Sequence, residues 1–338
     1  MIRSIFIFIL IYSRIGQASL SMKLVQSITI DTKNKFQSTK LGGFSGLVIK
    51  GKDFYVVSDD RGRFGESRIY RLELSVPMEK SSAGIFKLDV KEKISLLKKN
   101  KKLPVFDLEA LAPFDGGWIL SSEGDLNAKP KIWPEIFFVK NKEIKQKIDL
   151  PEDFIPKFNG QQVRGLYNNK AFEGLYFDER SRRLLMVSES GLVQKKDGDL
   201  VFYILEYTEK NGEFSYDKMS QLDFNGKIEG SFLYNGASEL TQVSENTLLL
   251  LTRSVQASLS LQYTNIVWLI KRRSVKDSWE IKDKYIINPE NANEELNQNY
   301  EGMSLLEWNG RRYLVLVSDD NFNSFEKTVF SFFDFEVK

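Results

Sequence analysis

The stretch AFEGLYFDERSRRLLMVSES, residues 171–190, contains the pattern that decides the fold of this chain. The motif Phe172-Glu173-Gly174-Leu175 opens an apolar segment, a charged turn follows, and a second apolar segment ends in Ser188-Glu189. Short apolar segments separated by turn residues are typical of neighbouring β-strands. The stretch therefore predicts two antiparallel strands, with one acidic residue at the start of the first and another at the end of the second.

The same plan occurs five times along the chain. Its apolar marker positions are separated by 64, 64, 65 and 63 residues, and they are Leu47, Leu111, Leu175, Leu240 and Met303. So regular a period indicates a structural repeat. In the third unit we expect four strands, over residues 172–177, 183–188, 201–207 and 214–224. Four antiparallel strands repeated radially predict an all-β protein of the β-propeller class, in which ring closure hides the sheet edges.

The number of blades follows from the chain length. Of the 338 residues, about 320 remain once an N-terminal leader is set aside, and this length predicts five four-stranded blades. The last unit has only three expected strands, whereas residues 23–30 form a strand-like segment ahead of the first unit. We therefore expect the N-terminal strand to complete the last blade and close the ring. Six blades and an open linear array are the alternatives.

Two missing residue types restrict the chemistry. The sequence contains no histidine and no cysteine, which excludes Ser-His-Asp triads, cysteine nucleophiles, haem, iron–sulfur clusters and zinc sites built from thiolate or imidazole. A metal ion would have to be bound by oxygen, with Ca²⁺ as the first candidate and Mg²⁺ as the second. The formal net charge of +2 gives no reason to expect a nucleic-acid partner.

The N-terminus has the features of a secretion signal. Arg3 is followed by the apolar run Ile5 to Tyr12, and then by the small residues Gly16 and Ala18, as a signal-peptidase site requires. The apolar run is too short to span a bilayer. We therefore expect residues 1–18 to be a signal peptide and residues 19–338 to form a single domain. The mature chain is expected to be a periplasmic or secreted bacterial monomer with no stable membrane insertion.

The acidic residues of the repeat are expected at one mouth of the propeller channel. In a blade the first strand lines the channel and the second runs back beside it, so the start of one and the end of the other meet near the axis. The residues at strand-one starts are Glu109, Glu173, Glu239 and Glu301. Those at strand-two ends are Asp59, Asp60, Glu123, Glu189, Arg253, Asp319 and Asp320.

So many carboxylates must share protons, pair with arginine or bind cations. All ten acids are therefore candidate ligands of Ca²⁺, with amide oxygens available from Asn169, Asn235, Asn299 and Asn321. The two Asp-Asp doublets are the strongest candidates, because a turn needs only one acid. The candidate catalytic residues are Glu173, Glu189, Arg253 and Glu301, and those for holding an anionic substrate are Arg61, Arg253 and Asn299. The alternative is that each recurring acid stabilises a turn.

Several of these segments together resemble the phytase-like domain family, whose members are described as having esterase-like activity of phytase. The similar segments are Asn169 to Leu175, Ser188-Glu189, Glu239-Leu240 with Arg253, Asn299 to Gly302, and Val317 to Asn321. The resemblance covers roughly residues 43–337, and it implies an exported bacterial propeller that acts on phosphate esters with a divalent metal. The first two repeats depart from the Glu-Gly pattern, with Ser45-Gly46 and Glu109-Ala110, so their contribution to the acidic mouth is open.

The sequence is consistent with three functions. The first is a metal-dependent hydrolase of phosphomonoesters or phosphodiesters, acting on a small phosphorylated or anionic substrate. The second is a propeller that binds calcium or a ligand at the same mouth without catalysis. The third, which depends on fold analogy alone, is a calcium-dependent lactonase.

Overall fold

The computed structural model describes residues 18–33, 35–76, 86–96, 106–228, 232–257, 261–289 and 293–338. Most of the predicted signal peptide, residues 1–17, lies outside the described residues. Within them the regular structure is made of strands and a few short 3₁₀ helices, which confirms the all-β class. No helix in these ranges is both long and apolar enough to cross a bilayer.

The strands form five four-stranded antiparallel sheets. Blade 1 contains β4 (Phe44–Lys50), β5 (Asp53–Ser58), β6 (Arg68–Ser75) and β7 (Lys87–Ser95). Blade 2 contains β8 (Leu108–Phe114), β9 (Gly117–Ser122), β10 (Glu135–Lys140) and β11 (Glu143–Ile148). Blade 3 contains β14 (Phe172–Asp178), β15 (Arg183–Ser188), β16 (Val201–Lys210) and β17 (Glu213–Asp223). Blade 4 contains β18 (Tyr234–Ser244), β19 (Thr247–Ala257), β20 (Leu261–Lys271) and β21 (Glu280–Ile286).

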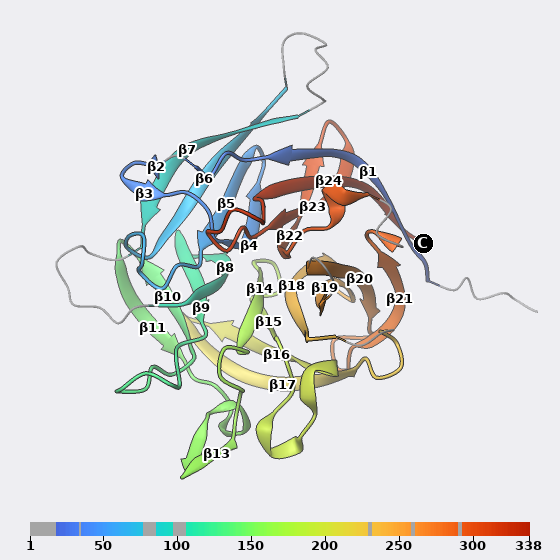
Figure 1. Ribbon diagram of the computed structural model, residues 1–338. Helices are drawn as coiled ribbons and strands as arrows, with labels where there is room; N and C mark the ends of the chain where they lie inside the picture. The colour runs from blue at the N-terminus through green and yellow to red at the C-terminus, as the bar shows by residue number, and fades with distance from the viewer. Residues whose placement is uncertain are drawn as a thin grey trace, which may run out of the picture.

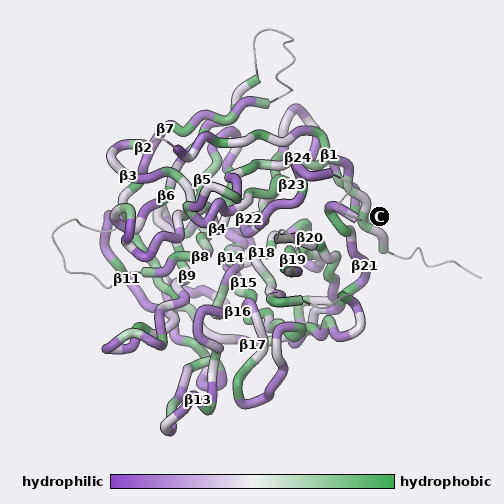
Figure 2. The backbone as a smooth tube through the Cα atoms, in the orientation of Figure 1, coloured by the Kyte–Doolittle hydropathy of each residue, from purple (hydrophilic) through white to green (hydrophobic). Residues whose placement is uncertain are grey.

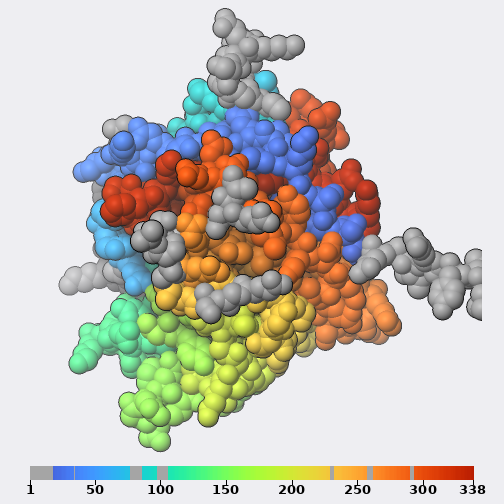
Figure 3. Space-filling model, turned by 45° about the vertical axis from the view of Figure 1, so that its right-hand side comes forward, coloured from blue at the N-terminus to red at the C-terminus, as the bar shows by residue number. Residues whose placement is uncertain are grey.

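Blade 5 combines the two ends of the described chain. It contains β22 (Tyr300–Trp308), β23 (Arg311–Ser318), β24 (Val329–Val337) and β1 (Leu20–Thr29). Strand β1 pairs antiparallel with β24 along its whole length, and Figure 3 shows this N-terminal segment packed against the C-terminal one. The predicted closure by the N-terminal strand is therefore confirmed, with the strand beginning at Leu20 rather than residue 23.

The five blades surround a common axis, as Figure 1 shows. Their first strands are innermost and contact one another in a closed cycle, β4 with β8, β8 with β14, β14 with β18, β18 with β22, and β22 with β4. This cycle confirms the five-bladed propeller and leaves no room for the six-bladed or linear alternatives. Two short hairpins lie outside the blades, β2 (Lys35–Phe36) with β3 (Thr39–Lys40), and β12 (Lys157–Asn159) with β13 (Gln161–Arg164).

The core lies between adjacent blades, because the apolar side chains on the faces of neighbouring sheets pack against each other. Between blades 5 and 1, for example, Phe44 and Phe54 pack with Phe330 and Phe332, and all four are fully buried. Hydrophobic and hydrophilic residues alternate along many of these strands in Figure 2. The alternation follows from the period-two geometry of a strand.

Small residues allow the first strands to approach closely at the axis. A Cβ atom at Gly174 would lie 2.7 Å from the backbone nitrogen of Leu240, in the next blade. At Gly302 it would lie 2.5 Å from the Ser45 carbonyl oxygen, and at Gly46 it would lie 2.9 Å from Cα of Ala110. At these three positions the narrow hub of a five-bladed ring therefore leaves no room for a side chain, whereas blades 2 and 4 have Ala110 and Glu239 there.

The closing strand is expected to contribute strongly to stability. Met22 is buried in the apolar cluster between blades 4 and 5, whereas the next residue, Lys23, is exposed. We predict that Met22→Ala lowers the free energy of unfolding by about 2–4 kcal/mol, measured by urea denaturation. Lys23→Ala is the matched control, and its change should stay within about 0.5 kcal/mol. Equal effects of the two substitutions would contradict this role of β1.

Candidate functional site

A β-bulge in the first strand of every blade sets the direction of the side chains at the channel mouth. In blade 3, Phe172 pairs with Ser188 and Gly174 pairs with Val187, so Glu173 is the extra residue. The same shift of register falls at Glu301 in β22. It also occurs at Ser45-Gly46, Glu109-Ala110 and Ser238. Bulges re-aim side chains and are common beside active sites.

The acids that follow the second strands are placed by a recurring backbone hydrogen bond. The N–H of Glu189 donates to the carbonyl of Ala171 at 2.7 Å, and the N–H of Asp319 donates to that of Asn299 at 2.9 Å. The equivalent bonds in blades 1 and 2 join Asp59 to Gly43 and Glu123 to Asp107. Each bond holds the end of strand two against the start of strand one in the same blade. The backbone of the repeat therefore delivers both kinds of acid to the same mouth.

These residues surround a cavity of about 190 Å³, which we call the acidic cavity. The residues that line it are Asp59, Arg61, Arg63, Glu109, Glu123, Asn169, Glu173, Glu189, Tyr234, Arg253, Glu301, Asp319 and Asn321. Four of the five blades contribute an acid, and blade 4 contributes Arg253 instead. The structure thus brings together most of the predicted site residues from strands that are far apart in the sequence.

The two aspartate doublets divide between the cavity and the scaffold. Asp59 and Asp319 line the cavity, but their neighbours do not. Asp60 forms a buried ion pair with Arg68, with 2.6 Å between Oδ2 and Nη1, and accepts hydrogen bonds from the backbone N–H groups of Gly62 and Phe64. Asp320 accepts from the N–H groups of Gly43 and Phe322. The second acid of each doublet therefore stabilises a turn, as the alternative interpretation expected.

Glu239 also lies outside the acidic cavity, because it occupies a different position in the repeat. The bulged residue of β18 is Ser238, so Glu239 aligns with Gly174 rather than with Glu173. Its carboxylate accepts hydrogen bonds from the N–H groups of Leu240 and Leu47 at 3.0 and 3.4 Å. A shift of one residue reverses the side-chain direction along a strand. Glu239 is thus buried between the first strands of different blades.

Two residues of the site were not singled out from the sequence, Tyr234 in the lining of the acidic cavity and Asp107 beside Asp59 and Glu109. Asp107 lies two residues before Glu109 and forms an ion pair with Arg61. The ring of Tyr234 lies against the Arg253 guanidinium, with 5.4 Å between the guanidinium carbon and the ring centroid. Asp107 occupies the repeat position of Asn299, where other blades have glycine or alanine. A polar residue at this otherwise small position was the signal that could have identified Asp107. Nothing in the repeat pattern marks Tyr234.

Arg253 is the counter-charge on one side of the cavity. Its guanidinium forms an ion pair with Glu301, lies 3.6 Å from an oxygen of Glu189, and donates a hydrogen bond to Oδ1 of Asn299 at 2.8 Å. Asn299 in turn donates to Glu301 at 2.8 Å. Asn299 does not line the cavity, so its observed contacts orient Arg253 and Glu301. Arg253 itself remains accessible from the cavity at its side chain, which is 13% exposed.

Arg61 supplies the counter-charge on the other side. Its side chain is 42% exposed and forms an ion pair of 2.5 Å with Oδ2 of the buried Asp107. It also donates to the amide oxygen of Asn169, so it joins loops of blades 1, 2 and 3 across the mouth. Arg61 adopts a left-handed backbone conformation, with φ of 50°. The predicted substrate-binding arginine is therefore at the cavity and partly open to solvent.

The cavity raises the pKa values of its carboxyl groups. Burial is the main cause at Glu173 and Glu189, and repulsion from neighbouring carboxylates raises both pKa values further. Burial raises the pKa of Glu123 to about 7, against a hydrogen bond from the backbone N–H of Ala171 that lowers it. Burial also raises the pKa of Asp319 to about 7. The metal-free cavity therefore retains protons near neutral pH.

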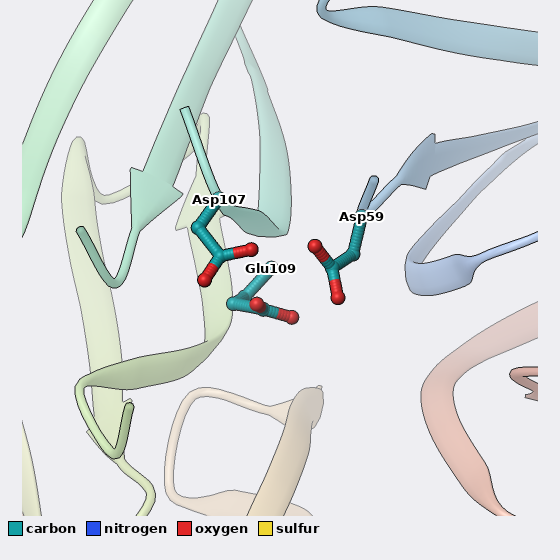
Figure 4. Close-up of side chains that lie close together, drawn as sticks. All are labelled: Asp59, Asp107 and Glu109. Carbon is teal, nitrogen blue, oxygen red and sulfur yellow. The ribbon is translucent and has the colours of Figure 1, made fainter. Parts of the chain in front are cut away.

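The donor set fits a cation that prefers oxygen ligands. One oxygen each from Asp59, Asp107 and Glu109 lie within 4.8 Å of one another, and the three side chains point toward a common space in Figure 4. Both carboxylate oxygens of Glu189 and Oε2 of Glu173 are buried without a hydrogen-bond partner among the described residues. Unpaired buried carboxylates are costly unless they bind a proton or a cation. Ca²⁺ accepts six to eight such oxygens in loose geometry.

Comparisons with known proteins agree with the fold and identify a family. The family model "Phytase-like: Esterase-like activity of phytase" matches residues 39–322. No curated protein matches the chain. The Bacteroides ovatus xyloglucan PUL GH43B structure gives a TM-score of 0.50 at 11% identity, and the match covers 90% of this chain and 54% of that chain. A mutant of the Cellvibrio cellulosa alpha-L-arabinanase gives 0.44 at 12% identity, covering 85% and 90%.

The likeness to the Bacteroides ovatus structure shows the fold alone. The chain spans about half the length of the Bacteroides ovatus structure. Sequence identity near one in ten gives no basis for transferring an activity, because one fold hosts many functions.

The pKa values predict how the stability of the metal-free protein depends on pH. The folded-state pKa values of Glu123 and Asp319, about 7, lie above the ordinary values near 4. These groups therefore stabilise the fold fully below about pH 4, and the contribution is lost as the pH rises through 7. We predict that the free energy of unfolding in EDTA falls by roughly 2–3 kcal/mol for each of these two groups from pH 5 to pH 8.

The measurement is urea denaturation across this pH range. The double substitution Glu123→Gln with Asp319→Asn should reduce the dependence, and Glu213→Gln, at an exposed position, should leave it unchanged. A metal-free protein that becomes more stable between pH 5 and pH 8 would contradict the prediction.

Proposed function

Because the chain belongs to the phytase-like family, esterase-like activity of phytase, we propose that it is an exported, metal-dependent hydrolase of phosphoric esters. The observation that supports this most directly is the acidic cavity, where buried carboxylates lie beside a buried arginine. Phosphoryl chemistry without histidine or cysteine has two requirements. It needs carboxylates that can hold a cation, and an arginine that can hold an anion.

The cation side of the cavity contains Asp59, Asp107, Glu109, Glu123 and Glu173. These are the residues that would hold Ca²⁺, or Mg²⁺ in its place. A bound divalent cation would supply Lewis-acid stabilisation of phosphoryl oxygens and a water of lowered pKa. The carboxylates themselves are positioned by backbone, since Ala171 N–H donates to Glu123 and the bulges direct Glu109 and Glu173.

The anion side contains Arg253. Its ion pair with Glu301 and its hydrogen bond to Asn299 fix the plane of the guanidinium, and its buried Nε has no hydrogen-bond partner among the described residues. A fixed guanidinium can donate two parallel hydrogen bonds to phosphate oxygens. Arg253 would therefore stabilise the charge that develops on the phosphoryl group, and Arg61 at the open mouth would guide the anion in.

Glu189 is the candidate acid–base residue. It is 1% exposed, and neither of its oxygens has a hydrogen-bond partner within the described chain. One of these oxygens lies 3.6 Å from Nη2 of Arg253. A substrate oxygen held by Arg253 would lie within reach of Glu189, which could transfer a proton to the leaving alcohol or take one from water. The cavity volume of about 190 Å³ suits one phosphate group, with the alcohol part outside.

The proposal includes location and assembly. The leader-like residues 1–18 end just before β1, which starts at Leu20, so signal-peptide removal would leave the ring-closing strand intact. Strand β1 completes blade 5 within the same chain, so ring closure needs no second subunit. These observations support a periplasmic or secreted monomer that acts on a small phosphorylated substrate.

We predict metal-dependent turnover of phosphoric esters. The protein should be assayed against p-nitrophenyl phosphate, bis-p-nitrophenyl phosphate, a carboxylic ester and a lactone, after EDTA treatment and after addition of Ca²⁺ or Mg²⁺. Hydrolysis of a phosphoric ester that is lost in EDTA and restored by the cation is the expected result. No turnover on any phosphoric ester, with cation binding retained, would instead favour the non-catalytic binding function. Turnover confined to the lactone would overturn the proposed substrate class.

We further predict distinct effects of two substitutions. Glu189→Gln removes the acid–base group and should lower kcat by about 10²–10⁴-fold with little change in KM. Arg253→Lys keeps the charge but loses the planar fork, and should lower kcat/KM by about 10²-fold or more. Glu213→Gln, at an exposed position, is the control and should retain full activity. Wild-type rates in both variants would remove Glu189 and Arg253 from the mechanism.

A further inference from the structure

We propose that the acidic cavity binds two divalent cations, with Glu109 as a ligand shared between them. This inference rests on the cation-binding part of the proposed function and specifies its stoichiometry. Its basis is the arrangement of five carboxylates, Asp59, Asp107, Glu109, Glu123 and Glu173.

The five carboxylates form two groups that overlap at a single residue. One group is Asp59, Asp107 and Glu109, and the other is Glu109, Glu123 and Glu173. Within each group the candidate oxygens lie within 4.8 Å of one another, which is about twice a Ca²⁺–oxygen distance of 2.4 Å. Among the described residues no single group contains all five. One ion can therefore be surrounded by either group, but not by both.

Glu109 is the residue best placed to be shared. Its carboxylate lies in the cavity and is 5% exposed. It has an oxygen within 4.8 Å of those of Asp59 and Asp107 in one group, and of those of Glu123 and Glu173 in the other. The hydroxyl of Ser45 donates to its Oε2 at 3.1 Å. This bond from blade 1 fixes a side chain of blade 2. Because a carboxylate has two oxygens, a carboxylate held in this way can face one ion on each side.

Each group also has a buried oxygen that the protein does not satisfy. In the first group it is Oδ1 of Asp107, which is 2% exposed, and in the second it is Oε2 of Glu173, which is 3% exposed. Neither oxygen has a hydrogen-bond partner among the described residues. Such atoms are rare in folded proteins and indicate an absent ligand when several face one space. Their presence in both groups points to an ion in each.

The charge of the two groups agrees with two ions. When ionised, the five carboxylates carry five negative charges, and the ion pair between Arg61 and Asp107 offsets one. Arg253, the other arginine at the cavity that the ion pairs involve, is paired with Glu301, outside both groups. Four negative charges therefore remain, which two divalent cations neutralise and one does not. Buried charges that stay uncompensated are costly.

Mn²⁺ provides the first test, because it needs no substitution. Two ions that share a carboxylate would lie about 3.5–4 Å apart, close enough for their spins to couple. Wild-type protein loaded with two equivalents of Mn²⁺ should show an exchange-coupled EPR spectrum, and native mass spectrometry should show two bound ions per chain. An uncoupled six-line spectrum at full loading, or saturation at one ion, would overturn the inference.

Substitutions then show which carboxylates bind each ion. Asp107→Asn and Glu173→Gln should each lower the stoichiometry from two bound ions to one and abolish the coupled spectrum. Glu109→Gln should weaken the binding of both ions and raise each Kd by at least about tenfold. Glu213→Gln is the control and should bind two. Circular dichroism verifies that each variant is folded. Loss of the same single ion in Asp107→Asn and Glu173→Gln would overturn the shared-ligand arrangement.

The outcome is separable from that of the proposed function. One bound ion together with cation-dependent turnover would overturn the two-ion inference and leave the hydrolase proposal standing. Two coupled ions without turnover would support the inference and favour the binding function. No bound ion at millimolar Mn²⁺ or Ca²⁺ would overturn both the inference and the metal dependence.

Discussion

The close approach of five strands at one axis is the constraint on which the rest of the structure depends. With only five blades, the first strands of neighbouring sheets come so near that a Cβ atom at Gly46, Gly174 or Gly302 would collide with the next blade. Blades 1, 3 and 5 therefore have glycine at this position, whereas blade 2 has Ala110 and blade 4 has Glu239. The adjacent bulge residue supplies the side chain that faces the mouth in blades 3 and 5. A narrow hub places groups from five distant segments around one small cavity, which no local stretch of chain could do.

The same narrowness determines the electrostatics. Carboxylates that belong to separate blades are forced together out of water, so burial and mutual repulsion raise the pKa values of Glu173, Glu189 and Glu109. Two arginines offset part of the charge, Arg253 from blade 4 and Arg61 from blade 1. Asp59, Glu173 and Glu189 have buried oxygens without a hydrogen-bond partner among the described residues. A cavity of this kind is destabilising when empty of protons and cations, and it is therefore better explained by ligand binding than by stability.

The arrangement also divides the cavity by charge. Asp59, Asp107 and Glu109 point toward one space from blades 1 and 2, whereas Arg253 with Glu301 and Asn299 forms the opposite side from blades 4 and 5. Glu189 belongs to the side of Arg253 and lacks hydrogen-bond partners in the described part of the chain. A cation and an anion could thus be held next to each other with an acid–base group beside them. In this member of the phytase-like family, these residues form the candidate site.

The sequence by itself determined the repeat, the five blades and the closing strand, because a period of about 64 residues and an alternating apolar pattern reflect how each blade must bury its faces. It also identified most of the cavity acids, since each lies at the start of a first strand or just after a second strand of the repeat. Only the tertiary structure decided which acids face the cavity. Glu239 is one position away from the bulge and turns between the strands, Asp60 is held by Arg68, and Asp107 enters from a position that is small in other blades. Side-chain direction at a bulge and the choice of ion-pair partner depend on contacts between segments far apart in the chain, and a linear pattern does not encode them.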